Sequence, residues 1–406
     1  MKRIVIIGGG FAGLWSAIGA ARKLHELRVE GNEVEVVLIN RDSFFGVRPR
    51  FYEKDPHNYR IPLIQVLEPV GVRLIEGEVG RIDTQSQKII INQTEKQIEL
   101  NYDRLVIAAG SQLLLPEITG LKEYAFTVDT IKDAIHLDKH INGLPDLPEV
   151  EGKYTTIVVG AGFTGLEIAT EMTSRLKEIA KKENKESEVK VILIDRNPTI
   201  GQDLGVHPGP IIEQALIDMD IEIHTNETVI SIDSKGVILD SGERLVALTT
   251  IWTGGVKASP LAADLPVEKD VLGRLLVDSC LKVEGLPSVF AAGDTARAKT
   301  DDNHVALMTC QHAIPQGKFA GHNVVSDLLG LEGIPYKQEI YNTCLDLGPW
   351  GALVTNGWDR VPQSQGEDGK KIKQYINQKL IYPPLSGNRE ELFKEAAPTE
   401  LKIRLS

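Results

Sequence analysis

Apolar, largely β-branched runs alternate with helix-forming stretches along most of the chain. Residues 2–7 form such a run before a glycine-rich turn, and residues 155–159 form another before a second such turn. A helix-forming stretch and a further apolar run follow each turn, at 34–40 and at 189–195. Strand, glycine turn, helix and strand make a βαβ unit, so the chain is predicted to contain this unit twice.

Other apolar runs complete the predicted sheets. Residues 102–110 and 251–255 are expected to be the closing strands of the two units, and 289–294 one more strand. Later elements are expected in this order: a helix over about 305–329, short strands at 339–345 and 351–355, and a loop rich in Gly, Gln and Asp. This order predicts an α/β fold of two Rossmann-like domains, the second inserted in the first, and a small C-terminal α+β segment.

The composition excludes several classes of protein. Of 406 residues, 42% are apolar and 25% charged, and no apolar run is long enough for a membrane-spanning helix. The net charge of -12 argues against a nucleic-acid partner. Cys280, Cys310 and Cys344 lie too far apart for a disulfide framework or a zinc cluster, so no metal is expected and a cytoplasmic location fits.

Each glycine turn predicts a dinucleotide site. In the first, Gly8 permits a tight turn, Gly10 lets the backbone approach a pyrophosphate, and Gly13 lets the following helix pack close to the strand. The phosphates would then bind at the positive end of that helix. Phe11 and Ala12, inside the turn, are further candidate contacts.

The second turn repeats this logic with Gly160, Gly162 and Gly165. Asp195 ends the following strand, where a carboxylate pairs with a ribose 2′-hydroxyl and repels a 2′-phosphate. The second nucleotide is therefore expected to be NADH and not NADPH. Arg196 follows directly and could bind a phosphate instead, so this preference stays open.

Three further residues near the turns have open roles. Asn40 ends the second strand of the first unit, where its amide oxygen could accept from a ribose in place of the usual carboxylate. Arg41 follows it, as a ligand contact or as part of a solvated turn. Glu167 could complement the dipole of its helix, hold a nicotinamide amide, or carry protons near a redox ring.

Four segments together resemble the type II NADH:quinone oxidoreductase family. They are residues 4–13, 160–167, 251–259 and 265–294. The resemblance implies an enzyme that passes hydride from NADH to FAD and then electrons to a quinone-like acceptor. It implies an FAD-binding domain of residues 1–120 and 285–332, an NADH-binding domain of 121–284, and a C-terminal domain of 333–406 that acts as a cover, a dimer surface or a peripheral membrane contact.

The same resemblance implies particular site residues. Asp294, after Gly293, would hold the ribityl chain of FAD, and a helix after it would point its positive end at the flavin; capping of that helix is the other role open to Asp294. Further contacts are implied for four other residues: Ala109 and Gly110 on the FAD side, and Thr164 and Gly254 on the NADH side. The implied catalytic residues are Glu167, Gln311 and His312.

The segment 310–317 departs from the family pattern, with Cys310 in place of an alanine and Pro315 in place of a glutamine. A proline there is expected to kink the helix. His312 could protonate a reduced acceptor or face solvent. The acceptor is therefore open, and two rivals remain: a reductase of an iron–sulfur protein such as ferredoxin or rubredoxin, and a non-enzymatic NADH-sensing flavoprotein.

The tail and the cysteines limit the partners. No cysteine precedes Cys280, so electrons are not expected to leave through a thiol pair beside the flavin. Residues 370–406 have eight basic and four acidic side chains, but Pro383, Pro384 and Pro398 interrupt any long apolar face. We expect a cytoplasmic protein with at most peripheral contact to the cytoplasmic face of a membrane, and a homodimer is one open oligomeric state.

Overall fold

The first βαβ unit belongs to a five-stranded parallel sheet in the computed structural model, which describes residues 1–399. The sheet has the order β21-β9-β1-β2-β5. Its strands are β1 (Lys2–Ile7), β2 (Val34–Asn40), β5 (Arg73–Glu76), β9 (Arg104–Ile107) and β21 (Val289–Ala291). Because β21 lies far along the chain from the other four strands, the second unit is inserted in the first, as predicted.

The second unit forms a similar sheet of five parallel strands in the order β11-β18-β12-β13-β14. Its strands are β11 (Ala125–Phe126), β12 (Thr155–Val159), β13 (Lys190–Asp195), β14 (Ile221–Thr225) and β18 (Thr249–Trp252). The α-helices within residues 1–399 are α1 (Phe11–Glu26), α2 (Ile64–Leu67), α3 (Leu121–Tyr124), α4 (Ile131–Gly143), α5 (Phe163–Ala180), α6 (Gly209–Asp218), α7 (Cys310–Leu328), α8 (Gly366–Tyr375) and α9 (Arg389–Glu395).

Each sheet is covered by other elements on both faces. Successive residues of its central strand point to opposite faces and so pack against different elements. Ile4 and Ile6 of β1 pack against α1, α7 and α9, whereas Val5 and Ile7 pack against a small antiparallel sheet. That sheet consists of β6 (Glu78–Asp83), β7 (Lys88–Asn92) and β8 (Gln97–Asn101). In the second lobe, α4 and α5 cover one face, and β15 (Val229–Asp233), β16 (Gly236–Leu239) and β17 (Arg244–Val246) cover the other.

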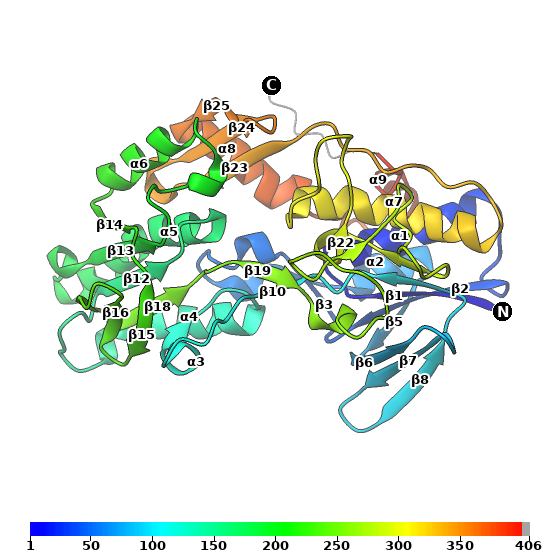
Figure 1. The fold of residues 1–406 in the computed structure, drawn as a ribbon, viewed down its shortest axis with the longest axis horizontal. Coiled ribbons are helices and arrows are strands. Elements are labelled where there is room, and N and C mark those ends of the chain that lie inside the picture. Colours follow the sequence, from blue (N-terminus) through cyan, green and yellow to red (C-terminus); the bar gives the residue numbers. More distant parts are fainter. Residues whose placement is uncertain (400–406) are drawn as a thin grey trace.

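Two extended crossings connect the lobes, and they lie side by side between the sheets (Figure 1). β10 (Ser111–Leu113) leaves the first lobe, and β19 (Val256–Ala258) returns to it. The two strands pair in antiparallel register, with Ser111 opposite Ala258 and Leu113 opposite Val256. Four short strands outside these sheets form two further pairs: β3 (Phe44–Gly46) with β4 (Arg60–Pro62), and β20 (Leu275–Leu276) with β22 (Ala296–Arg297).

The C-terminal segment lies across both lobes (Figure 1). It contains an antiparallel sheet of β23 (Asn342–Asp346), β24 (Ala352–Asn356) and β25 (Val361–Gln365), followed by α8 and α9. The expected loop after residue 355 is wrong, because β25 and the start of α8 occupy it. β25 alternates between exposed and half-buried residues with none fully buried, so it carries little apolar signal, and pairing with β24 supplies its structure. Glu400, Lys402 and Arg404 of the charged tail lie outside the described residues.

The helix expected over 305–329 begins later, at Cys310. Thr309 caps it by accepting from the backbone N–H of His312, so the capping role considered for Asp294 is wrong. Pro315 lies inside this helix and leaves the Gln311 carbonyl without its usual i+4 donor. The buried amide of Gln338 donates to that carbonyl at 3.2 Å, which lets the helix continue unbroken to Leu328.

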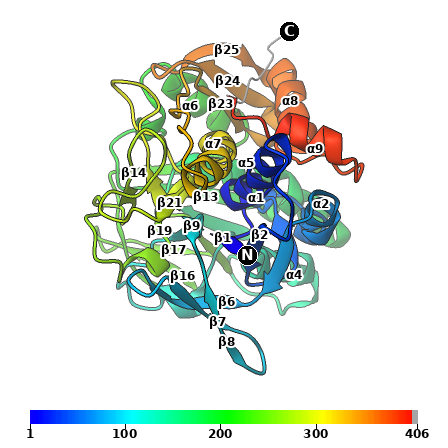
Figure 2. The ribbon, with the colours of Figure 1, turned by 90° about the vertical axis from the view of Figure 1, so that its right-hand side faces the viewer.

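Helices α1 and α7 pack at very short range over the first sheet (Figure 2). A Cβ on Gly321 would lie 2.3 Å from the carbonyl oxygen of Ser16, and one on Gly317 would lie 2.4 Å from that of Ala12. Glycine at these positions lets the two backbones come together. Since α7 begins at the cavity described below, this contact also fixes one of the cavity walls.

We expect Gly321→Ala to destabilise the protein by about 1–3 kcal/mol, because the added methyl group forces α7 away from Ser16. Thermal unfolding should show this as a midpoint several degrees lower. Gly143→Ala is the matched control, since a Cβ at that residue of α4 would meet no atom of residues 1–399 within 4 Å. An equal loss in both variants would contradict the packing argument.

Candidate active site

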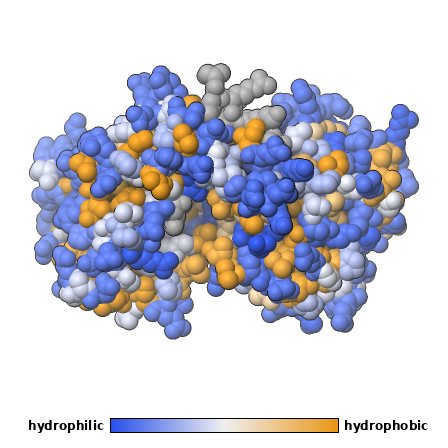
Figure 3. Space-filling model, turned by 45° about the horizontal axis from the view of Figure 1, so that its top comes forward, coloured by the Kyte–Doolittle hydropathy of each residue, from blue (hydrophilic) through white to orange (hydrophobic). Residues whose placement is uncertain are grey.

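A single cavity of about 3000 Å³ lies between the two lobes and under the C-terminal segment. Both glycine turns, both crossings and parts of α7 and α8 line it. Figure 3 shows the surface hollowed between the lobes, with apolar and polar side chains around the hollow. The two predicted nucleotide sites therefore open into one shared space.

The first glycine turn has the backbone that a pyrophosphate requires. Gly8 has a φ of 101°, and a Cβ on Gly13 would lie 1.8 Å from the Gly8 carbonyl oxygen. A Cβ on Gly10 would meet no described atom within 4 Å, so that position opens into the cavity. Among residues 1–399, no side chain caps α1 and no acidic residue lies in its first turn, so its N–H groups can bind an anion.

The second turn reproduces this geometry. Gly160 has a φ of 106°, and a Cβ on Gly165 would lie 1.7 Å from the Gly160 carbonyl oxygen. Gly162 opens into the cavity, and within the described chain the start of α5 has neither a side-chain cap nor an acid in its first turn. Thr164 and Gly254 also line the cavity. Both turns therefore fit the phosphates of a dinucleotide.

Asn40 and Asp195 play the same local role in the two units. The Asn40 Oδ1 accepts from the Gly9 N–H at 2.8 Å, and one Asp195 oxygen accepts from the Ala161 N–H at 2.5 Å. The other Asp195 oxygen accepts from the Asn197 N–H at 2.8 Å. Each side chain thus holds its glycine turn in place, while both residues, with Arg41, still line the cavity.

Asp294 lies where the first sheet meets the cavity, in a short 3-10 turn that follows β21. Its Oδ2 accepts from the Ser111 hydroxyl at 2.6 Å. Burial raises the pKa of Asp294, and the Ser111 hydrogen bond partly offsets this. Ala109, Gly110 and Gly293 line the same wall. A carboxylate among close backbone segments fits a polyol chain such as that of FAD.

Glu167 forms a buried ion pair with Lys373 of α8, at 2.7 Å between Oε1 and Nζ. The same oxygen accepts from the backbone N–H of Asp346 at 3.1 Å. Burial raises the pKa of Glu167, and Lys373 opposes the rise only in part. Burial alone would lower the pKa of Lys373, but the Glu167 carboxylate raises it, so Lys373 stays charged. Glu167 is therefore a buried carboxyl group whose pKa is raised by burial and held down in part by a fixed positive charge.

Of the two other predicted catalytic residues, one lines the cavity and the other does not. Gln311 lines the cavity, and its amide, oriented by its hydrogen bonds, pairs with the backbone of Asn342. His312 is 1% exposed, stacks on Tyr341, and is not among the residues lining the cavity. Burial lowers its pKa to about 4. The solvent-facing orientation considered for His312 is wrong, because its side of α7 faces the C-terminal segment.

The cysteines do not act as thiolates here. Cys280, Cys310 and Cys344 are all free, and the last two line the cavity near Lys373. Burial raises the pKa of Cys310 to about 11 and that of Cys344 to about 12. Both thiols are therefore protonated at neutral pH and are poor nucleophiles. No cluster of metal-ligating side chains occurs in the described part of the chain.

Sequence reasoning missed two parts of this site. Lys373 lies over 200 residues from Glu167, and in the sequence it is one of several lysines in a charged segment. Arg48 forms an ion pair with Asp129 across the cavity, and no motif contains either residue. Only the complementary charges could have suggested these pairs, and charge alone does not select partners.

Comparison with known proteins agrees with the geometry. The family model of pyridine nucleotide-disulphide oxidoreductases matches residues 2–317. The chain belongs to this family. An NADH dehydrogenase-like protein of Mycobacterium tuberculosis is 45% identical over 398 residues, which is 98% of each chain. A type II NADH:quinone oxidoreductase of the same species is 31% identical over 317 residues, which is 72% of this chain and 66% of the relative.

A solved structure of NDH2 from Plasmodium falciparum in complex with NADH shares the fold of this family member. Its TM-score is 0.77 at 15% sequence identity, and the match covers 97% of both chains. The α/β fold class predicted from the sequence is confirmed by this match and by the two sheets. The resemblance to type II NADH:quinone oxidoreductases is confirmed by the sequence relatives.

We expect Lys373→Met to lower stability by about 3–5 kcal/mol at pH 8, because it leaves the Glu167 carboxylate buried without a partner. The folded-state pKa of Glu167 is already raised and would rise further. A raised carboxyl pKa means that stability falls as pH rises above the value of the unfolded chain, so the loss should be smaller at pH 5.5. Denaturant unfolding at both pH values measures this.

Two further variants control this experiment. Adding Glu167→Gln should restore much of the loss caused by Lys373→Met, because it removes the unpaired charge. Lys371→Met breaks an exposed pair with Asp368 on the same helix and should leave stability nearly unchanged. Equal, pH-independent losses for Lys371→Met and Lys373→Met would contradict a special role for the buried pair.

Proposed function

We propose that this protein is an FAD-dependent NADH dehydrogenase that delivers electrons to a quinone-like acceptor. The observation that carries the proposal is the single cavity into which both glycine turns open, with Glu167 and Lys373 in its wall. The enzyme class and the cofactors FAD and NADH, as predicted from the sequence, are confirmed by kinship with NADH dehydrogenases. FAD, when bound, takes up the hydride of NADH and releases electrons to an acceptor.

The residues would divide the work as follows. The Gly8–Gly10–Gly13 turn would bind the FAD pyrophosphate, and Asp294 the polyol chain. Further FAD contacts would come from seven residues on the same side of the cavity: Phe11, Ala12, Asn40, Arg41, Ala109, Gly110 and Gly293. The second turn, with Gly160, Gly162, Thr164, Gly165, Asp195 and Gly254, would bind NADH.

The side chains of the protein itself would hold a proton and position the groups that line the cavity. Glu167 has a raised pKa and a fixed cationic neighbour, so it can hold a proton at its carboxyl oxygen close to the reacting rings. Gln311 is anchored to Asn342 and would line the acceptor side of the cavity. His312 lies behind that wall, and we infer that it positions the start of α7 and has no contact with the acceptor.

We also propose the domain bounds given by the sequence. Residues 1–120 and 285–332 would form the FAD-binding domain, and 121–284 the NADH-binding domain. The return of β21 to the first sheet supports the split of the FAD-binding domain into two segments. Residues 333–406 would act mainly as a cover, because Lys373 of this segment reaches Glu167.

We expect rapid anaerobic mixing with NADH to bleach the flavin absorbance of the purified protein, because the second turn brings the dinucleotide into the space shared with FAD. NADPH should react more slowly, since the Asp195 carboxylate repels a 2′-phosphate. A protein that purifies without flavin, or flavin that NADH leaves oxidised, would contradict the proposal.

Two further measurements separate the rival functions. Turnover with a soluble quinone well above about 1 s⁻¹ would exclude a non-enzymatic sensor. Faster reoxidation of the flavin by ferredoxin than by quinone would favour a reductase of an iron–sulfur protein.

We infer peripheral contact with the cytoplasmic face of a membrane. No helix within residues 1–399 is both long enough and apolar enough to cross a bilayer. Val361, Tyr375 and Leu385 of the C-terminal segment are exposed, and Lys371 lies one helical turn before Tyr375 on α8. We expect salt-sensitive cosedimentation with anionic vesicles and none with neutral ones. Lys371→Glu should weaken it. Vesicle binding that does not depend on lipid charge or salt would contradict this contact.

Sedimentation velocity tests the homodimer that the sequence leaves open.

A further inference from the structure

Arg48 lies in the cavity wall outside both glycine turns and away from the pair of Glu167 and Lys373. It begins a short 3-10 helix (Arg48–Arg50) that follows β3, and the ring of Pro49 restricts the backbone of that turn. The side chain is 34% exposed although the cavity lies beside it. About two thirds of the side-chain surface is therefore covered by other protein groups.

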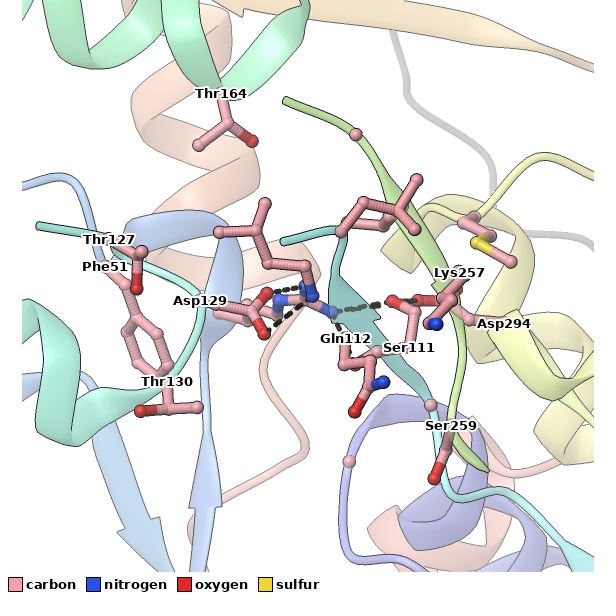
Figure 4. A pocket seen from close by; sticks show the side chains of 18 of the residues that line it. Phe51, Ser111, Gln112, Thr127, Asp129, Thr130, Thr164, Lys257, Ser259 and Asp294 are labelled. Carbon is pink, nitrogen blue, oxygen red and sulfur yellow. Dashed lines mark hydrogen bonds and ion pairs between the residues drawn. The ribbon is translucent and has the colours of Figure 1, made fainter. Parts of the chain in front are cut away.

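The guanidinium joins side chains from three distant parts of the chain. Its Nη1 donates to the Ser111 hydroxyl at 2.8 Å, and its Nη2 forms an ion pair with Asp129. Nη1 also lies 3.9 Å from the Oδ2 of Asp294, which accepts from Ser111. Figure 4 shows Asp129 to one side and the Ser111–Asp294 pair to the other, with dashed lines marking the interactions that connect them.

These contacts hold both ends of the crossing β10. Ser111 begins β10 and binds Arg48 directly, whereas Leu113 ends it and donates its N–H to Asp129 at 3.0 Å. Asp129 itself belongs to the second lobe, between β11 and the capping residue Thr130 of α4. The pair of Arg48 and Asp129 is therefore a direct link between the lobes at the crossing.

Such a link reinforces the crossing, which consists of two short strands. β10 and β19 pair over only three residues each. An arginine suits this place, since its planar fork can donate to two partners on different sides at once. A lysine carries the same charge but has one compact ammonium group, which cannot reproduce that bridge.

We propose that Arg48 is a positioning residue that, with Asp129, fixes the angle between the two nucleotide-binding lobes. This inference rests on the proposed function, because the angle sets how closely NADH approaches the flavin. Small misplacements of reacting groups have large effects on rate, so loss of the bridge should slow hydride transfer more than it weakens nucleotide binding.

The test uses the FAD-loaded protein and five variants. Arg48→Met, Arg48→Lys and Asp129→Asn should each lower the limiting rate of flavin reduction by NADH about tenfold. The double variant Arg48→Met with Asp129→Asn should be no slower than the slower single variant, because both break one contact. Lys54→Met is the matched control: it breaks an exposed ion pair with Glu178, also between the lobes, and should leave the rate unchanged.

Hydrogen exchange of the cofactor-free protein gives a second readout. The amides of β10 and β19 should exchange faster in the three Arg48 and Asp129 variants and normally in Lys54→Met. Full rescue by Arg48→Lys, wild-type behaviour of Asp129→Asn, or multiplied rate losses in the double variant would each overturn the proposal. Wild-type flavin that NADH cannot reduce would overturn the proposed function instead, while the exchange data would still decide the role of Arg48.

Discussion

The contact between each glycine turn and the helix after it is the constraint on which the structure depends. At Gly13 and Gly165 a side chain would lie under 2 Å from the carbonyl oxygen of the first glycine of the same turn. Without side chains there, the helix N-termini come up to the sheet edges and their N–H groups point into the cavity. The shared cavity exists because two such cradles, built from separate βαβ units, face each other.

The chemistry of that cavity depends on a part of the chain that lies outside both glycine-turn units. The C-terminal segment contributes Lys373, which turns Glu167 from a residue at the start of a helix into half of a buried ion pair. It also contributes the backbone of Asn342, which orients Gln311, and the amide of Gln338, which compensates for Pro315. Cover and active site are thus one unit, and a change in the cover reaches the redox centre.

The sequence predicts the parts of this protein that are local. Glycine spacing and apolar runs are properties of short segments, so both turns, most strands of the two sheets and the inserted order of the lobes could be predicted, whereas β5, β11 and β14 are not among the predicted strands. Residues 361–375 could not, because β25 has no apolar side of its own and forms by pairing with β24. The burial of His312 and the partners of Glu167 and Arg48 depend on segments distant in the sequence, and a single sequence carries no signal for such pairs.

The central claim is that the two cradles hold their nucleotides in one space. A crystal structure of the protein with FAD and NAD⁺ tests it most directly. The account predicts one pyrophosphate on the turn of Gly8–Gly13 and the other on that of Gly160–Gly165, with both redox rings in the cavity beside Glu167. Nucleotides bound in separate cavities, or either turn blocked by protein atoms, would contradict it.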